Sequence, residues 1–306
     1  MSARAKYPDA FDCIVVGAGP AGLLAATYLG RYRRRVVVAD AGDSRARRIP
    51  RINNCPGFPD GISGRDLLAR LREQAALYGA RFFDRAVESI ERTEAGFAAD
   101  CGAARLRAPR LLLATGVVDL IPDLPEIDKN IDRGTLRLCP VCDGFEAVDK
   151  KIAVFGISDH ALREAVFLRT YSPNVTLLAN DPDQVPAHIR AGAGKAGIGI
   201  CDNAGDIQSG SGGYEALLRD GEKRPFDVIY PALGCNVRSE LAVAVGVQRD
   251  EAGHILVGPH QRASVDGIFA AGDVVHSLNQ IAVAFGQAAT AATAIHNSLG
   301  AEDVKE

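Results

Sequence analysis

One glycine-rich turn constrains the fold of this chain more than any other feature. Residues 11–16 form a short apolar run rich in β-branched side chains, which predicts a buried strand, and the turn Gly17-Ala18-Gly19-Pro20-Ala21-Gly22 follows it. Residues 23–32 then carry apolar side chains at helical spacing, and residues 36–40 form a second apolar run that ends in an acid. This order predicts a βαβ unit and hence a parallel sheet with a right-handed crossover.

The glycine positions in this turn suit a dinucleotide phosphate. Gly17 permits the tight turn, Gly19 lets a pyrophosphate approach the backbone, and Gly22 lets the helix and the strand pack closely. The helix that follows supplies free N–H groups and partial positive charge to the phosphates. Asp40, at the end of the second strand, would accept hydrogen bonds from a ribose. The arrangement predicts a dinucleotide site; the alternative is a glycine turn in an ordinary α/β protein.

A related pattern returns well after the first unit. Residues 151–155 predict a strand, residues 156–161 a turn, residues 162–171 a helix and residues 175–178 a further strand. The proline-spaced residues 121–125 between the two units have the composition of a linker. The two units together predict an α/β fold with two dinucleotide-binding, Rossmann-like, three-layer domains.

Composition and charge argue against several kinds of partner. The chain has 306 residues and a formal net charge of -3 at pH 7, so no electrostatic attraction to nucleic acid or to an anionic membrane is expected. No apolar run has the length of a membrane span, and the first residues lack the apolar stretch of a secretory signal. The seven cysteines are mostly scattered singly, which favours a reducing compartment and predicts a cytoplasmic protein.

The pair Cys139-x-x-Cys142 is the second motif that carries chemistry. Two thiols at this spacing can close a disulfide, and their proximity lowers the pKa of one thiol, which favours attack on a partner disulfide. Asp143 follows directly and can carry the proton that each exchange step requires. The alternatives are a zinc knuckle and a pair of inert buried thiols. Zinc normally needs four ligands, and because no second pair of this kind occurs in the sequence, no metal site is predicted.

The order and spacing of the motifs resemble a known family. Taken together, the chain is similar to the low-molecular-weight thioredoxin reductases, flavoproteins that pass reducing equivalents to a small protein disulfide. The segments that carry this resemblance are residues 17–22, 54–58, 114–116, 139–144, 272–273 and 280–282.

The resemblance implies FAD as the cofactor. The glycine turn would hold the pyrophosphate, Asp40 the adenosine ribose and Asp273 the ribityl chain. Gln280 and Ile281 would begin a helix whose positive end faces the flavin pyrimidine. The complete set of FAD-binding residues that the resemblance implies is Gly17, Ala18, Gly19, Pro20, Ala21, Gly22, Asp40, Asn54, Val87, Ala114, Thr115, Gly116, Gly272, Asp273, Gln280 and Ile281.

The resemblance also implies the catalytic roles and the layout of the chain. Cys142 would exchange electrons with the flavin, Cys139 would attack an external disulfide, and Asp143 would be the acid/base. Residues 1–119 and 239–306 would form a discontinuous FAD domain. Residues 120–238 would form the former pyridine-nucleotide domain, which carries the redox centre and rotates during turnover. The implied partner is a thioredoxin-like protein or a small disulfide, and the implied assembly is a homodimer.

The second nucleotide turn departs from this family pattern. Within residues 156–161, Ser158 stands where a glycine would let the pyrophosphate approach, and Asp159 adds negative charge beside it. The family reads the 2'-phosphate of NADP with a His-Arg-Arg cluster, whereas residues 179–181 here include Asp181 and no arginine. The loss of two arginines removes charge-assisted bonds worth ~1.5–3 kcal/mol each. NADPH is therefore a doubtful electron donor.

Three explanations of this departure remain open. NADH could bind with Asp181 on its free ribose hydroxyl. Alternatively, the domain could have lost nucleotide binding and receive electrons from ferredoxin or from another flavin, including a second FAD in the middle domain, as in known side branches of the family. Finally, a relaxed loop could tolerate the change. The sequence resembles most the NADPH-independent side branches, of the diflavin-linked or ferredoxin-dependent type.

The sequence therefore predicts an FAD-dependent dithiol/disulfide oxidoreductase. Electrons would pass between FAD and the Cys139–Cys142 disulfide, and onward to a thioredoxin-like or small disulfide substrate, with a donor other than NADPH. The alternatives are an NAD(P)H-dependent thioredoxin reductase, a thiol oxidase that runs the same chemistry in reverse, and a non-catalytic flavin-binding sensor module.

Overall fold

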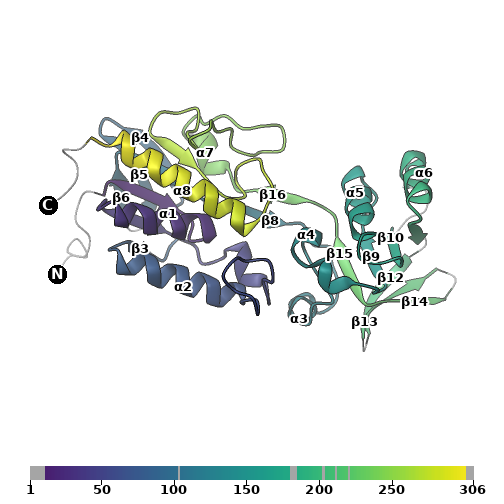
Figure 1. Ribbon diagram of the computed structural model, residues 1–306. Helices are drawn as coiled ribbons and strands as arrows, with labels where there is room; N and C mark the ends of the chain where they lie inside the picture. The colour runs from purple at the N-terminus through teal and green to yellow at the C-terminus, as the bar shows by residue number, and fades with distance from the viewer. Residues whose placement is uncertain are drawn as a thin grey trace.

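The protein folds into two lobes that lie side by side, as a computed structural model shows (Figure 1). The structure describes residues 11–102, 104–179, 185–201, 204–210, 212–219 and 221–300. Both ends of the described chain belong to the first lobe and the middle of the chain forms the second. No helix among the described residues combines the length and the apolar character that crossing a membrane requires.

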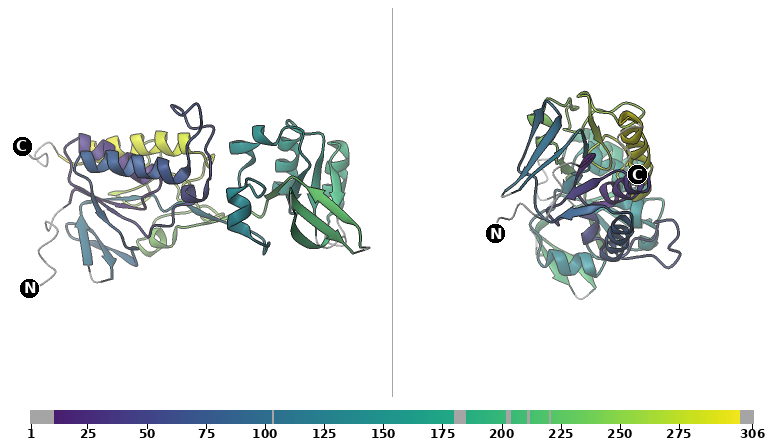
Figure 2. Two further views of the ribbon diagram at one scale, coloured as in Figure 1. Left: turned by 90° about the horizontal axis from the view of Figure 1, so that it is seen from below. Right: turned by 90° about the vertical axis from the view of Figure 1, so that its left-hand side faces the viewer.

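A five-stranded parallel sheet forms the centre of the first lobe. Its strands are β17 (Ile268–Ala270), β7 (Arg110–Leu113), β1 (Cys13–Val16), β2 (Val36–Ala39) and β3 (Arg81–Phe83), in that spatial order. Helices α1 (Pro20–Arg31), α2 (Gly64–Leu77) and α8 (Ile281–Ser298) cover one face. The antiparallel strands β4 (Ser89–Thr93), β5 (Gly96–Cys101) and β6 (Ala104–Ala108) cover the other (Figure 2).

The central strand β1 shows why its sequence is apolar throughout. Cys13 and Val15 pack in the core under the helices, whereas Ile14 and Val16 pack in the core under β4–β6. Successive side chains of a strand point to opposite faces, so a strand covered on both faces needs an apolar residue at every position.

The second lobe repeats the parallel arrangement on a smaller scale. Its sheet has the order β11 (Gly199–Cys201), β10 (Val175–Leu178), β9 (Ile152–Phe155) and β15 (Val228–Pro231). An antiparallel sheet of β12 (Ala204–Gly210), β13 (Gly213–Leu218) and β14 (Lys223–Phe226) lies beside it. The helical elements are α3 (Ile127–Asp132), α4 (Pro140–Asp143), η3 (Phe145–Ala147), α5 (Asp159–Leu168) and α6 (Ala187–Lys195).

A short two-stranded ribbon connects the lobes. Strand β8 (Val117–Asp119) pairs antiparallel with β16 (Cys235–Val237), so the chain enters and leaves the second lobe at one place. The domain boundaries inferred from the sequence, after residues 119 and 238, lie beside the ends of this ribbon and stay a proposal. The remaining elements, η2 (Arg45–Arg48) and α7 (Glu240–Ala244), belong to the first lobe.

Two helices begin earlier than their apolar periodicity predicts. Helix α1 begins at Pro20 rather than at residue 23, because proline suits the first turn of a helix, where its missing N–H has no partner to lose. Helix α5 begins at Asp159 rather than at residue 162, because the Ser158 hydroxyl accepts a hydrogen bond from Ala161 N at 3.2 Å and caps the first turn. The predicted turn at residues 156–161 is therefore partly helical.

Candidate active site

One cavity of about 790 Å³ collects nearly all of the residues predicted to bind or react. The catalytic candidates Cys139, Cys142 and Asp143 all line it. Of the predicted FAD-binding residues, all but Ala18 and Gly22 line it as well. The cavity thus joins the glycine turn of the first lobe to the Cys-x-x-Cys segment of the second.

The glycine turn is shaped by close packing of backbone against backbone. Gly17 has φ +103°, and a Cβ placed on it would lie 2.4 Å from the carbonyl oxygen of Ala114 on the neighbouring segment. A Cβ on Gly22 would lie 1.9 Å from Gly17 O. Gly22 therefore acts behind the cavity wall, as the close-packing role predicted for it requires.

Asp40 has a structural task in the glycine turn. Its Oδ1 accepts a hydrogen bond from Ala18 N at 2.9 Å, and its Oδ2 accepts one from Gly42 N at 3.0 Å. Asp40 therefore fixes the glycine turn while it lines the cavity. A carboxylate oxygen can accept more than one hydrogen bond, so these contacts leave capacity for a ribose hydroxyl.

The first lobe offers a site that fits a dinucleotide such as FAD. Helix α1 has Gly19 at its N-cap, no side-chain cap and no acidic residue in its first turn, so its first N–H groups face the cavity without competition from side chains. In the described part of the chain, Asn279 Oδ1 is buried without a hydrogen-bond partner, and Asn279 lines the same cavity. When bound, FAD supplies the two-electron chemistry of the site.

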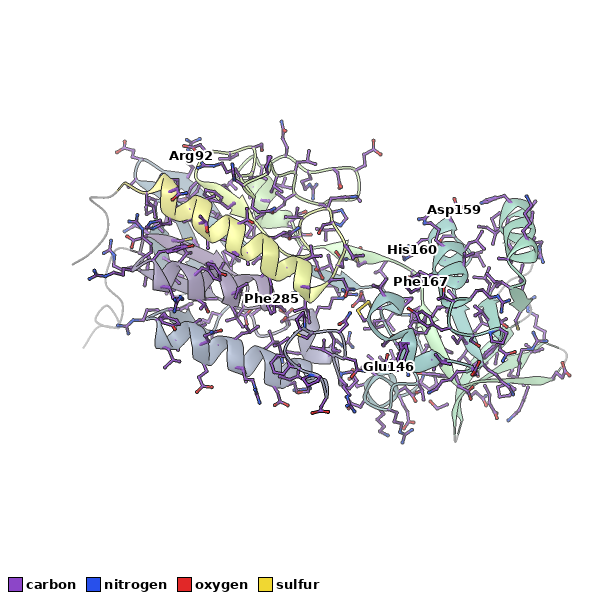
Figure 3. All side chains as sticks on the ribbon, in the orientation of Figure 1. Arg92, Glu146, Asp159, His160, Phe167 and Phe285 are labelled. Carbon is purple, nitrogen blue, oxygen red and sulfur yellow. A yellow bond between two sulfur atoms is a disulfide. The ribbon has the colours of Figure 1, made fainter. Side chains whose placement is uncertain are left out.

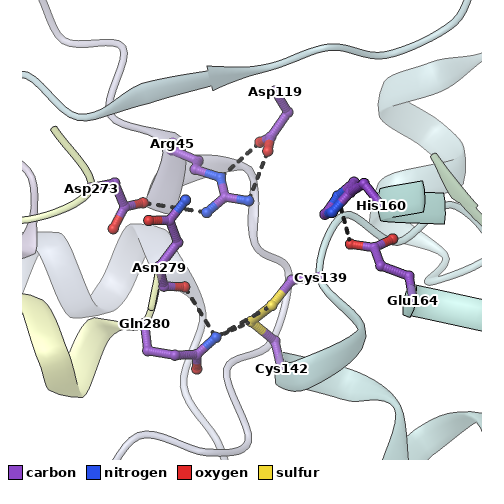
Figure 4. Close-up of polar contacts among 9 residues, drawn as sticks. All are labelled: Arg45, Asp119, Cys139, Cys142, His160, Glu164, Asp273, Asn279 and Gln280. Carbon is purple, nitrogen blue, oxygen red and sulfur yellow. Dashed lines mark hydrogen bonds and ion pairs between the residues drawn. A yellow bond between two sulfur atoms is a disulfide. The ribbon is translucent and has the colours of Figure 1, made fainter. Parts of the chain in front are cut away.

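A partly buried ion-pair cluster lies in the wall of this cavity and was not predicted from the sequence. Arg45 forms a two-pronged contact with Asp119, with Nε at 2.8 Å and Nη2 at 2.7 Å from its carboxylate oxygens, and its Nη1 lies 3.3 Å from Asp273 Oδ2 (Figure 4). Burial alone would lower the pKa of Arg45, but the hydrogen bond and charge of Asp119 raise it. For Asp273 the effect of burial has the opposite sign: burial raises the pKa of this carboxyl, although the charge of Arg45 opposes the rise.

The Cys139–Cys142 pair forms a disulfide at the start of a short helix. Their Cα atoms are 5.3 Å apart, Cys139 is the N-cap of α4, and Pro140 occupies its first position. Figure 3 shows the disulfide between the two lobes, near the N-terminal end of α8. The side-chain amide of Gln280, at that end, donates to both sulfurs, from 3.4 Å at Cys139 Sγ and 3.3 Å at Cys142 Sγ.

Asp143 is held by two residues that sequence patterns did not reveal. Tyr230 on β15 donates its hydroxyl to Asp143 Oδ1 at 2.8 Å, and Arg137 Nη1 donates to Asp143 O at 2.6 Å. Burial raises the pKa of Asp143 to about 6, although the Tyr230 hydrogen bond and the charge of Arg137 oppose this. A carboxyl with a pKa near neutrality, beside a disulfide, has the property expected of a proton carrier in thiol exchange.

Titratable side chains of α5 follow the second nucleotide turn. His160 Nε2 lies 3.2 Å from Glu164 Oε1, and burial raises the pKa of Glu164 to about 7 (Figure 4). His188 Nε2 lies 3.2 Å from Asp159 Oδ1. Asn180 and Asp181, which bear on the choice of nucleotide, lie outside the described residues.

Comparisons with known proteins agree with this geometry. The family model described as pyridine nucleotide-disulphide oxidoreductase matches residues 11–288. Thioredoxin reductase of Mycolicibacterium smegmatis is 30% identical over 305 residues, which cover 95% of this chain and 97% of that protein. NADPH-dependent thioredoxin reductase 3 of Arabidopsis thaliana is 30% identical over 308 residues, which cover 92% of this chain but 57% of that longer protein.

A solved structure extends the likeness to the whole fold. The crystal structure of thioredoxin reductase from Streptococcus pyogenes MGAS5005 matches with a TM-score of 0.87 and 25% identity, and the match covers 95% of this chain and 98% of that one. The two-domain α/β fold predicted from the sequence is confirmed, and so is the flavin-dependent disulfide oxidoreductase class. The chain belongs to the pyridine nucleotide-disulphide oxidoreductase family, and within it to the thioredoxin reductase-like enzymes.

Proposed function

We propose that this enzyme reduces the disulfide of a thioredoxin-like protein. The observation that carries the proposal is the position of the Cys139–Cys142 disulfide. It lines the same cavity as the glycine turn that would bind FAD. The relatives named above, which are called thioredoxin reductases, support the choice of partner.

The protein side chains account for the exchange step. After reduction of the disulfide to two thiols, the Cys139 thiolate attacks the partner's disulfide and forms a mixed disulfide, and the partner's second sulfur leaves as a thiolate. The protonated Asp143 carboxyl donates the proton that this leaving thiolate takes up. The Cys142 thiolate then attacks Cys139 Sγ, which re-forms the Cys139–Cys142 disulfide and releases the reduced partner.

For the electron donor, we infer a reduced nicotinamide nucleotide. The expectation of a donor other than NADPH, made from the sequence, has less support than this alternative, because the two curated relatives described above are named as thioredoxin reductases and one of them as NADPH-dependent. A donor other than NADPH is the second candidate. It is favoured by Ser158, whose hydroxyl already caps the helix where a pyrophosphate would bind, and by the neighbouring carboxylate of Asp159.

Anaerobic titration of the purified flavoprotein separates the two donors. NADPH, NADH and photoreduced ferredoxin are added in turn, and flavin absorbance is followed by stopped flow. Rapid bleaching by micromolar NADPH or NADH supports the first candidate. Bleaching by reduced ferredoxin alone supports the second, as does a ratio of two flavins per chain in place of one.

Turnover with a thioredoxin tests the partner. With the better donor, the wild-type enzyme should reduce thioredoxin, whereas Cys139→Ser should not, although its flavin should still be reduced. Cys101→Ala is the matched control, because Cys101 is buried in β5 away from the cavity lining. Equal turnover by wild type and Cys139→Ser would refute the proposed function.

A homodimer and a cytoplasmic location are kept as further proposals, which sedimentation and fractionation can check.

A further inference from the structure

Three side chains converge outside the redox cavity, near the Asp273 segment. Asp250 Oδ2 lies 3.3 Å from His254 Nδ1 and 3.1 Å from His276 Nδ1, and the three ligand atoms all lie within 4.8 Å of one another. None of the three lines the large cavity; Asp250 borders a smaller one of about 360 Å³. Residues 250 and 276 are distant in sequence, which is why no metal was predicted from it.

The backbone under these side chains is fixed by the core. His254 N donates to Asp250 Oδ1 at 2.8 Å, and Asp250 N donates to His254 O at 2.9 Å, which closes the turn between them. Ile255 N donates to Val274 O at 2.8 Å, and both of these residues are fully buried. The turn at residues 250–254 and the segment that leads to His276 are therefore held in register before any ligand binds.

The convergence offers three donor atoms that suit a cation. A carboxylate oxygen and two imidazole nitrogens place three lone pairs together unless protons or a metal ion separate them. In the described part of the chain, His254 Nδ1 is buried without a hydrogen-bond partner. The His276 side chain is 75% exposed, so the group is open to solvent on one side.

We propose that Asp250, His254 and His276 form a binding site for a divalent transition-metal ion, of which zinc is the best match. Two imidazoles and one carboxylate are a common donor set for such ions, and three protein ligands leave an open position for water at the exposed side. The proposal replaces the prediction of no metal and does not depend on the proposed function.

A bound ion would link two segments of the first lobe. His276 lies three residues after Asp273, a residue of the redox cavity wall, whereas the other two ligands belong to the turn at residues 250–254. Metal binding should therefore stabilise the fold around the Asp273 segment, because a ligand that binds only the native state raises its stability.

Calorimetric titration of untagged, oxidised holoenzyme with zinc chloride tests the site. The oxidised form is used because the Cys139–Cys142 disulfide then cannot offer thiolates. We expect one zinc ion per chain, a rise in the unfolding temperature with zinc, and a loss of affinity of ~10-fold or more in His276→Ala and Asp250→Asn. His260→Ala, which removes an exposed histidine elsewhere on the lobe, should bind zinc like wild type.

Cobalt(II) provides an independent readout of the ligands. Its visible absorption should appear in wild type and in His260→Ala and be absent in His276→Ala. Equal zinc affinity in wild type and His276→Ala would overturn the proposal. So would an unfolding temperature that depends on pH but not on zinc, since that result would identify the group as a protonated His–Asp cluster.

Discussion

The side-chain amide of Gln280 bridges Asn54 and the Cys139–Cys142 disulfide. Its Oε1 accepts a hydrogen bond from Asn54 Nδ2 at 2.9 Å, which orients the amide so that Nε2 faces both sulfurs. Gln280 is also the N-cap residue of α8, so the helix fixes its position. An N–H donor stabilises a thiolate more than a disulfide sulfur, because the thiolate carries charge.

We therefore predict that Gln280→Met makes the dithiol harder to form. A hydrogen bond worth about 1 kcal/mol corresponds to a shift of roughly 20 mV for a two-electron couple, here to a more negative midpoint potential. Equilibration with dithiothreitol buffers followed by thiol labelling measures the potential. Gln208→Met, on β12 of the second lobe, is the control. Identical potentials in wild type and Gln280→Met would show that the amide does not favour the reduced form.

Asp143 should give the exchange step its pH dependence. Burial raises its pKa to about 6, so the carboxyl is protonated below that pH and loses its proton as the pH rises through it. The rate of proton donation to the leaving thiolate should accordingly fall above about pH 6. Asp143→Asn should abolish this fall in rate with pH and slow the exchange by ~10²–10⁴-fold. Single-turnover oxidation of the reduced enzyme by thioredoxin, measured from pH 5 to about pH 9, checks both expectations.

Tyr230→Phe should raise the pH above which the exchange rate falls. The Tyr230 hydroxyl donates to Asp143 Oδ1 and stabilises the carboxylate, so its removal raises the pKa of Asp143 further, by roughly one unit. Tyr214→Phe, at a buried tyrosine on β13 of the same lobe, is the matched control. If the exchange rate of Tyr230→Phe still fell above about pH 6, this hydrogen bond would not set the pKa of Asp143.

Local sequence patterns were sufficient to predict two adjacent strands of each parallel sheet, β1 and β2 in the first lobe and β9 and β10 in the second, and the glycine turn. Each depends on residues that are neighbours in sequence. Continuous apolar runs form buried strands, and the spaced glycines allow the close backbone packing of the turn. The antiparallel strands β4–β6 and β12–β14 were not predicted. Their alternation is interrupted by exposed charges and glycines, as in the pattern of β14, whose first three residues are exposed.

The charged part of the site could not be predicted, because its members are far apart in the chain. Arg45 follows β2, Asp119 ends β8 and Asp273 follows β17, so only the folded sheet brings them together. The same holds for Tyr230 and Asp143. A ribose contact was expected for Asp40, but nothing in its spacing revealed that it also holds the Ala18 and Gly42 amides.

Arg45→Met should destabilise the first lobe. The change leaves Asp119 and Asp273 partly buried without their cation, and we expect a loss of about 2–3 kcal/mol near neutral pH. The charge of Arg45 opposes the effect of burial on the pKa of Asp273, so removing this cation should raise that pKa further. The loss of stability should therefore shrink as the pH falls and Asp273 becomes protonated. Urea unfolding at several pH values measures this. Arg47→Met changes an exposed arginine whose Nη1 donates to Gly42 O, and it should leave stability within about 0.5 kcal/mol of wild type. An equal loss there would contradict the ion-pair explanation.

Gly22→Ala should damage the FAD site through packing alone. Its Cβ would lie 1.9 Å from Gly17 O and 3.2 Å from Val15 Cγ1, so either the turn or the strand must shift. We expect a loss of about 2 kcal/mol or more in unfolding free energy, together with weaker retention of flavin on gel filtration. Gly286→Ala is the matched control, because Gly286 is also helical and a Cβ there meets nothing within 4 Å. That variant should gain up to about 1 kcal/mol from helix propensity and keep its flavin. If both variants retained flavin equally, Gly22 would not be required for the close approach of helix and strand.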